Sequence, residues 1–148
     1  MASSGELRRQ QNEKISERDT LVERKTAVDE IVQRIGTDFE YVITSVNDQI
    51  GECSWDYQSG LIGMKASVRQ DIEDAKEKYE YGDTKLKSCK INLQNESNRC
   101  QTRIDILNSE ISSLSSQIAQ AEYEEEQARK RAEEEAKKAQ TGGEEGDG

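Results

Sequence analysis

Residues 21–50, LVERKTAVDEIVQRIGTDFEYVITSVNDQI, decide the fold, because their apolar side chains recur at alternating steps of three and four. The series holds once Lys25 is allowed at one of its positions. Such steps place side chains on one face of an α-helix, and a repeat of seven is typical of a coiled coil. The apolar members of this face are Leu21, Val28, Val32, Ile35, Phe39, Val42, Val46 and Ile50.

The same spacing continues on both sides of this segment. Upstream, Ile15 and Leu7 extend it weakly, so we predict that helix one spans residues 6–50, with Gly36 as a weak point that costs about 1 kcal/mol relative to alanine. Residues 51–63, GECSWDYQSGLIG, lose the spacing and gather three glycines, which predicts a turn. The spacing then resumes and predicts helix two over residues 62–121.

The C-terminal part of the chain is charged and has no apolar stripe beyond alanines. Residues 122–140 are good helix formers with acid and base at spacings of four, which favours a solvated helical extension. Residues 141–148, TGGEEGDG, are predicted to be a disordered acidic tail. The predicted fold is therefore all-α: an antiparallel two-helix coiled-coil hairpin with unequal arms and a disordered C-terminal tail.

The unequal arms predict a surface that needs a partner. A helix one of this length covers helix two only to about Leu107, so the overhang from Asn108 to Ala121 is expected to lack a covering helix. Leaving an apolar stripe in water costs roughly 1.5 to 3 kcal/mol per side chain. We therefore expect partner helices on this overhang, on helix one and at the turn, at Val28, Val32, Ile35, Phe39, Val42, Val46, Trp55, Ile111, Leu114 and Ile118. For Trp55, which lies in the turn, the alternative role is to cover the end of the hairpin together with Tyr57, Leu61 and Ile62.

Composition narrows the classes of function. The formal net charge of -10 disfavours nucleic acid as a partner, and the chain has no histidine and no glycine-rich phosphate loop. We expect no catalytic, cofactor-binding or metal-binding residue and hence no enzyme. Three cysteines, Cys53, Cys89 and Cys100, have no metal-ligand spacing and are interpreted as small apolar core residues.

The start of the chain, MASSGELRRQQNEK, lacks the apolar core of a secretory signal, and no stretch approaches the roughly 20 apolar residues of a membrane span. We therefore expect a cytoplasmic protein without stable membrane insertion. Its partners should be helical proteins.

Trp55 lies in the predicted turn and is followed by Gly60 and Gly63. A helical hairpin with a tryptophan and glycines in its turn resembles the Trp-x-Gly family of small helical type VII secretion proteins. In length and in its charged second helix, the chain is similar to the helical proteins encoded beside LXG toxins in Gram-positive bacteria. The resemblance covers roughly residues 6–120. The motif departs from the family pattern, because the nearest glycine is five residues after Trp55.

The resemblance implies a non-catalytic helical adaptor or targeting factor that binds the helical N-terminal domain of an LXG-type toxin and assists its export. A second small helical protein is a further candidate partner, and export of the chain together with its partner, without a cleaved signal peptide, is an alternative to cytoplasmic retention. The family's export signal pairs an aromatic residue with a nearby acid. Tyr123 with Gln127 occupies the expected region, and Tyr79 with Asp83 is the alternative.

A structural role competes with this interpretation. The same heptads suit a homo-oligomeric coiled-coil spacer or scaffold that needs no other protein. A holdase chaperone of the prefoldin type requires a β-hairpin between its helices, and residues 51–63 are too few for it. Purification of the chain alone separates the adaptor from the spacer.

Overall fold

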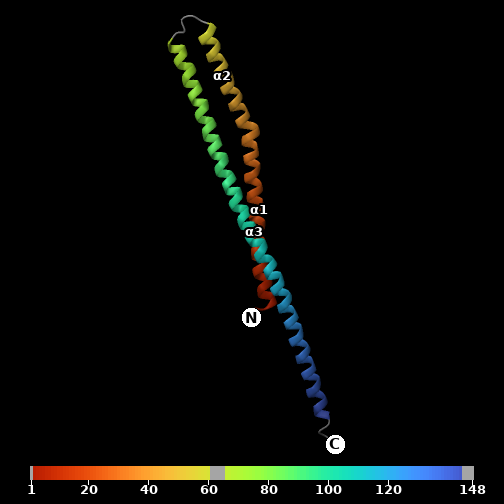
Figure 1. Ribbon diagram of the computed structural model, residues 1–148. Coiled ribbons are helices and arrows are strands. Elements are labelled where there is room, and N and C mark those ends of the chain that lie inside the picture. Colours follow the sequence, from red (N-terminus) through yellow and green to blue (C-terminus); the bar gives the residue numbers. More distant parts are fainter. Residues whose placement is uncertain (1, 61–65, 145–148) are drawn as a thin grey trace. The chain divides into compact units, whose positions relative to one another are not determined.

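The computed structural model describes residues 2–60 and 66–144, with side chains over residues 2–52 and 70–142. Every element in these ranges is a helix (Figure 1). The α-helix α1 spans Ser4–Arg34, the π-helix η1 spans Ile35–Glu40, α2 spans Tyr41–Gly60 and α3 spans Ala66–Glu144. The predicted all-α class is confirmed.

The chain divides into two compact units, and α1 and α3 contribute to both. Unit 1 combines Met1–Leu21 with Arg103–Gly148, and unit 2 is Val22–Thr102. Each unit is described by itself below.

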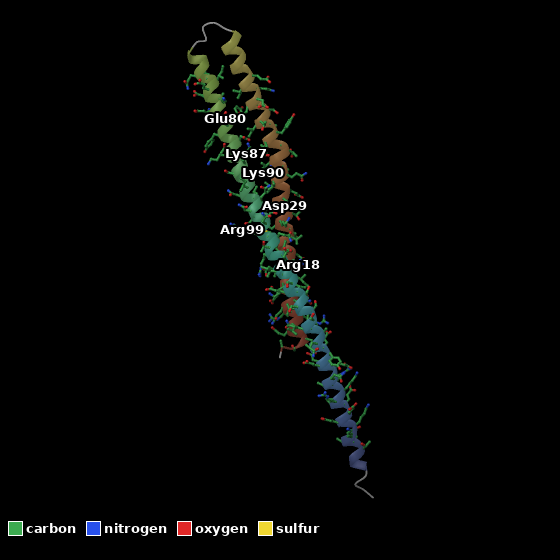
Figure 2. The ribbon with its side chains drawn as sticks, viewed as in Figure 1. Arg18, Asp29, Glu80, Lys87, Lys90 and Arg99 are labelled. Atoms are coloured by element: carbon green, nitrogen blue, oxygen red, sulfur yellow. The ribbon has the colours of Figure 1, made fainter. Side chains whose placement is uncertain are left out.

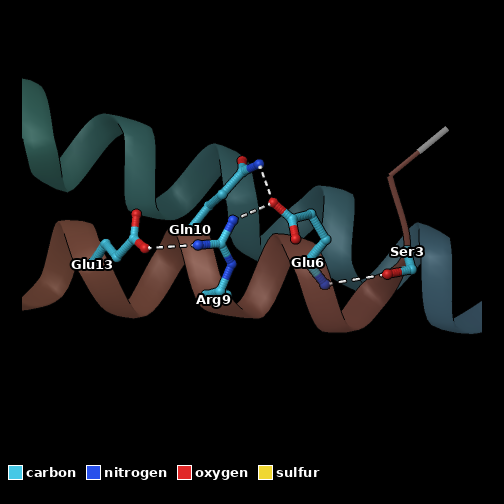
Figure 3. A network of polar contacts seen from close by, with 5 residues as sticks. All are labelled: Ser3, Glu6, Arg9, Gln10 and Glu13. Atoms are coloured by element: carbon cyan, nitrogen blue, oxygen red, sulfur yellow. Dashed lines mark hydrogen bonds and ion pairs between the residues drawn. The ribbon is translucent and has the colours of Figure 1, made fainter.

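The first turn of α1 is capped by Ser3, whose hydroxyl oxygen accepts a hydrogen bond from the backbone N–H of Glu6 at 3.3 Å (Figure 3). This contact satisfies one of the N–H groups that a helix start leaves without a partner. Side-chain bonds from Arg9 and Gln10 to Glu6, and from Arg9 to Glu13, extend the network along the exposed surface. The helix therefore begins at Ser4, two residues before the predicted start.

Polar contacts across unit 1 run in antiparallel order. The backbone N–H of Ser4 donates to Glu125 at 2.8 Å, and Lys14 pairs with Glu110 at 2.7 Å. Between them, the Gln11 amide donates to the Ser115 hydroxyl at 2.6 Å. As residue numbers rise along α1, the numbers of their partners on α3 fall.

Unit 1 also holds most of the buried apolar side chains. Leu7 of α1 is buried together with Leu114 and Ile118 of α3, with Ala121 packed against them, and Leu107 is fully buried. The expectation that residues 108–121 lack a covering helix is therefore wrong. Residues 4–18 of α1 cover them, because helix continues beyond residue 50 and displaces the pairing of the two segments toward the C-terminus of α3.

The region of the predicted turn is helical over most of its length. Residues 51–60 belong to α2, so the predicted end of helix one at Ile50 is wrong, and glycines such as Gly51 are tolerated within the helix. The predicted start of helix two at residue 62 lies outside the described residues, and α3 begins at Ala66. The last turn of α3 includes residues 141–144 of the predicted disordered tail, and the rest of that tail is outside the described residues.

Unit 2 has the same antiparallel order and a more polar interior. Arg24 pairs with Glu96 at 2.6 Å, and Lys90 of α3 pairs with Glu40 at 3.1 Å. Figure 2 labels Asp29 and Lys90 among the side chains of this unit. Buried residues of unit 2 in the described part of the chain are Ile35, Ser97 and Cys100.

Candidate helix-binding surface

The candidate surface consists of side chains of α1, η1 and α2 that do not face α3, so the positions that do face α3 are identified first. We call the positions that face α3 the seam. In α1 the seam runs at steps of three and four through buried and part-buried residues, as the heptads predict. In unit 2 these residues are Lys25, Val28 and Val32 of α1, followed by Ile35, the first residue of η1.

The π-helix η1 breaks this series by one residue. After Ile35 the seam restarts at the next residue, Gly36, and again follows steps of three and four. A π-helix bonds residue i to residue i+5, and so accommodates one residue more than an α-helix does over the same rise. The seam positions beyond the break are Gly36, Glu40, Ile43, Asn47 and Ile50, which are all part-buried.

The break turns an apolar face away from α3. Phe39 and Val42 are 53% and 52% exposed, and Val46 is part-buried. Phe39 lies near the end of η1, and Val42 and Val46 lie in α2; their steps of three and four place them on one side of the helix. We call Phe39, Val42 and Val46 the stripe. An unbroken α-helix would have carried these three residues into the seam behind Ile35.

The seam beside the stripe contains several polar groups. Lys90 and Glu40 meet there with side chains 30% and 22% exposed, and Gly36 lies where an added Cβ would be 3.9 Å from both of their charged ends. Further along, the Oδ1 atoms of Asn47 and Asp83 are buried, and neither has a hydrogen-bond partner. A buried polar atom without a partner costs about 1 to 3 kcal/mol. The observed pairing therefore places Glu40, Asn47 and Lys90 in the seam beside Ile43 and Ile50, while Phe39 and Val42 face outward.

Exposed apolar side chains gather in the same unit. Eight of the ten large exposed ones in the described part of the chain belong to unit 2, whereas unit 1 exposes Ile106 and Tyr123. Most of the exposed apolar surface from large side chains in the described part of the chain therefore lies in unit 2. The eight are Val22, Ile31, Phe39, Tyr41, Val42, Tyr79, Tyr81 and Ile91.

The other predicted partner-binding residues have different surroundings. Ile35, Leu114 and Ile118 are buried within the chain, which leaves them no face for a partner. Val28, Val32 and Ile111 are part-buried. Trp55 belongs to the backbone of α2, and its side chain is outside the described residues.

The two candidate export signals lie on α3. Tyr123 is 62% exposed and Gln127 is part-buried. Tyr79 is 43% exposed, and Asp83 forms an ion pair with Lys87 at 2.9 Å.

The cysteines divide between core and surface. Cys100 is buried, as predicted, but Cys89 is exposed, so its prediction as a core residue is wrong. The reason is a shift of register on α3, where the neighbouring Lys90 takes the seam position and pairs with Glu40. The side chain of Cys53 is outside the described residues.

The described part of the chain contains neither a metal-ligand cluster nor a membrane-spanning helix. No group of three or more His, Cys, Asp or Glu side chains is arranged to hold a metal ion there. Over the same residues, no helix combines the length and apolarity that a membrane span requires.

Comparisons of the chain with protein-family models, with curated proteins and with solved structures found no match.

Proposed function

We propose that the chain is an antiparallel coiled-coil hairpin with unequal arms that works as a non-catalytic helical adaptor. Its partner is the helical N-terminal domain of an LXG-type type VII secretion toxin, whose export it assists. The antiparallel contacts within each unit support the hairpin. The resemblance of the sequence to small type VII secretion proteins supports the class of partner.

The observation that carries the proposal is the exposure of Phe39, near the end of η1, and of Val42 in α2 on the same side of the helix. Helices commonly pack against other helices through an exposed row of apolar side chains at steps of three and four. Burying two such side chains yields roughly 1.5 to 3 kcal/mol each. A third helix on the stripe would recover this free energy without disturbing the seam.

Copurification from the native host tests the proposal. Tagged wild-type chain should capture a protein with a long helical N-terminal domain, identified by mass spectrometry, and Phe39→Asp with Val42→Asp should lose it. Both side chains are exposed, so the double variant should keep the helix content of the wild type. The matched control is Ile106→Asp, which changes a 46% exposed apolar residue of unit 1 and should retain capture.

Two results would count against the adaptor. One is capture of the same protein by the double variant at the wild-type level, which would remove the stripe from the binding surface. The other is a stable, fully helical homodimer of the chain alone with a sharp thermal transition. That result would favour the spacer or scaffold.

A further inference from the structure

We infer that the helix bound by the stripe is amphipathic and carries a row of carboxylates along the edge that lies over α3. This inference rests on the proposed function, because it names the chemistry of the partner helix. Its basis is the distribution of lysine side chains on α3, on the same side of the helix pair as the stripe.

The ion pairs of unit 2 identify that side. Arg24 directly precedes the seam residue Lys25, and it pairs at 2.6 Å with Glu96, which directly precedes buried Ser97. Residues that directly precede seam positions on two antiparallel helices therefore lie on the same side of the pair. Phe39 directly precedes the seam residue Glu40.

The same rule extends along α3 by steps of seven. Cys89 and Gly82 lie seven and fourteen residues before Glu96, so they share its side and hence the side of the stripe. Cys89 is exposed, and a Cβ added at Gly82 would have no atom within 4 Å, so the surface there is open. Lys85, three residues after Gly82, belongs to this side as well.

The lysines of this part of α3 fall into two groups. Residues 76–90 contain five lysines, and three of them hold a carboxylate of this chain. In the described part of the chain, no ion pair involves Lys78 or Lys85, which are seven residues apart on one line of the helix. Lys85 lies 5.4 Å from the centre of the Tyr81 ring, a contact that leaves its charge uncompensated. The three pairs are Lys76–Glu80, Lys87–Asp83 and Lys90–Glu40.

Lys85 is also level with the stripe. It lies five residues before Lys90, and Ser45 lies five residues after Glu40, the partner of Lys90. In an antiparallel pair, Lys85 is therefore level with Ser45, which lies between Val42 and Val46. A helix on the stripe has apolar side chains beneath it and an ammonium group at its α3 edge. A carboxylate at that edge would form the missing pair.

The α2 side of the stripe is acidic. Residues 35–52 contain four acids and no base; Asp38 pairs with Arg34 and Glu40 with Lys90, which leaves Asp48 and Glu52 without an ion pair in the described part of the chain. A second copy of the chain would pack α2 on α2 in a two-fold contact and bring Asp48 and Glu52 close to their own copies, which is unfavourable. The occupant we infer is therefore a helix of another protein, with acids over α3 and neutral or basic residues over α2.

Two synthetic helices test the inference on the full chain. Both carry leucines at steps of three and four, and one edge of the apolar face is glutamate in the first peptide and lysine in the second. Titration calorimetry should give about tenfold tighter binding of the glutamate peptide at low salt. In Lys78→Glu with Lys85→Glu the preference should invert, and 0.5 M salt should reduce it.

The possible outcomes separate failure of the inference from failure of the proposed function. Equal binding of the peptides, lost in Phe39→Asp, overturns the inference and leaves the adaptor intact. Binding unaffected by Phe39→Asp, or no binding of either peptide, overturns both. Sedimentation of the chain alone completes the test: a dimer that Phe39→Asp and Lys85→Glu each dissociate would make a second copy the occupant and overturn the inference.

Discussion

Asp29 joins two parts of the seam through one carboxylate. It accepts a hydrogen bond from Lys25 of the same helix at 2.7 Å and from the hydroxyl of Ser97 on α3 at 2.5 Å. Ser97 is buried, so Asp29 supplies a partner for a hydroxyl that has left water. The bonds from Lys25 and then Ser97 lower the pKa of Asp29 below its ordinary value.

This lowered pKa predicts a pH-dependent effect of Asp29→Asn. A carboxylate whose pKa is lower in the folded state stabilises the fold above its unfolded pKa, about 4, and loses this effect as the pH falls through the folded value. Asp29→Asn should therefore melt at a lower temperature than the wild type at pH 7. The two melting temperatures should converge near pH 2, as measured by circular dichroism.

Glu30→Gln is the matched control for this prediction. Glu30 is an exposed neighbour with no ion pair in the described part of the chain, and its replacement should change the melting temperature equally little at both pH values. A melting-temperature difference between Asp29→Asn and the wild type that stays constant from pH 7 to pH 2 would contradict the role assigned to the Asp29 carboxylate.

At the scale of elements, η1 is the feature that heptad counting missed. The apolar steps from Val28 to Val46 fit one unbroken helix, and nothing in hydrophobicity alone favours Glu40 over Phe39 as a seam residue. The polar residues indicate the alternative seam. Counted from Gly36, the positions Glu40, Ile43, Asn47 and Ile50 form a second series that overlaps the first, and Lys90 supplies a partner charge across the seam.

Deleting Gly36 should make the helix regular without changing which residues face α3. Removal of one residue places Glu40 four positions after Ile35, so the heptads of the two stretches join. A glycine inside a helix costs about 1 kcal/mol relative to alanine, and its removal should raise the free energy of unfolding by about that amount. Chemical denaturation monitored by circular dichroism measures the change.

Deleting Ser45 is the contrasting change. It shortens α2 by one residue where the heptads are already regular, so Asn47 and Ile50 leave the seam and stability should fall. Equal loss of stability in the two deletion variants would show that η1 does not hold an extra residue.

The span of pairing was mispredicted for a different reason. The glycines of residues 51–63 indicated a turn, but residues 51–60 are helical, because glycine lowers helix propensity without forbidding helix. An error of a few residues in the turn displaces all later pairs along α3. Leu114 and Ile118, predicted to await a partner, are consequently packed against Leu7.

Across the whole molecule, the heptads predicted the all-α class from local spacing alone. They could not predict which apolar residues remain exposed, since that depends on the pairing of distant segments. Phe39 and Val42 were predicted to bind a partner, and they are exposed. Ile35 carried the same expectation and is buried, one step away on the same series.

The C-terminal part of α3 supplies the prediction at this scale. The described side chains from Ala128 onward are exposed, and ion pairs there are local, such as Arg129–Glu126 at 2.8 Å. Residues 128–148 contain six acids and five bases, so their removal hardly changes the net charge. Truncation after Gln127 should lower the helical signal per molecule and leave the melting temperature unchanged.

Truncation after Gln117 is the comparison for this test. It removes Ile118 and the partners of the first turn of α1, such as Glu125, and should lower the melting temperature. A melting temperature that falls equally after both truncations would mean that the extension stabilises the fold.

The one extra residue in η1 also determines the direction in which the stripe faces around the helix axis. Each residue of an α-helix advances by about 100° around the axis, so one residue separates a sealed apolar face from an open one. If η1 relaxed to an α-helix, Phe39 and Val42 would rotate inward and Glu40 would rotate outward, with the sequence unchanged. Rotation of this part of the helix about its axis would then bury the stripe without breaking a covalent bond.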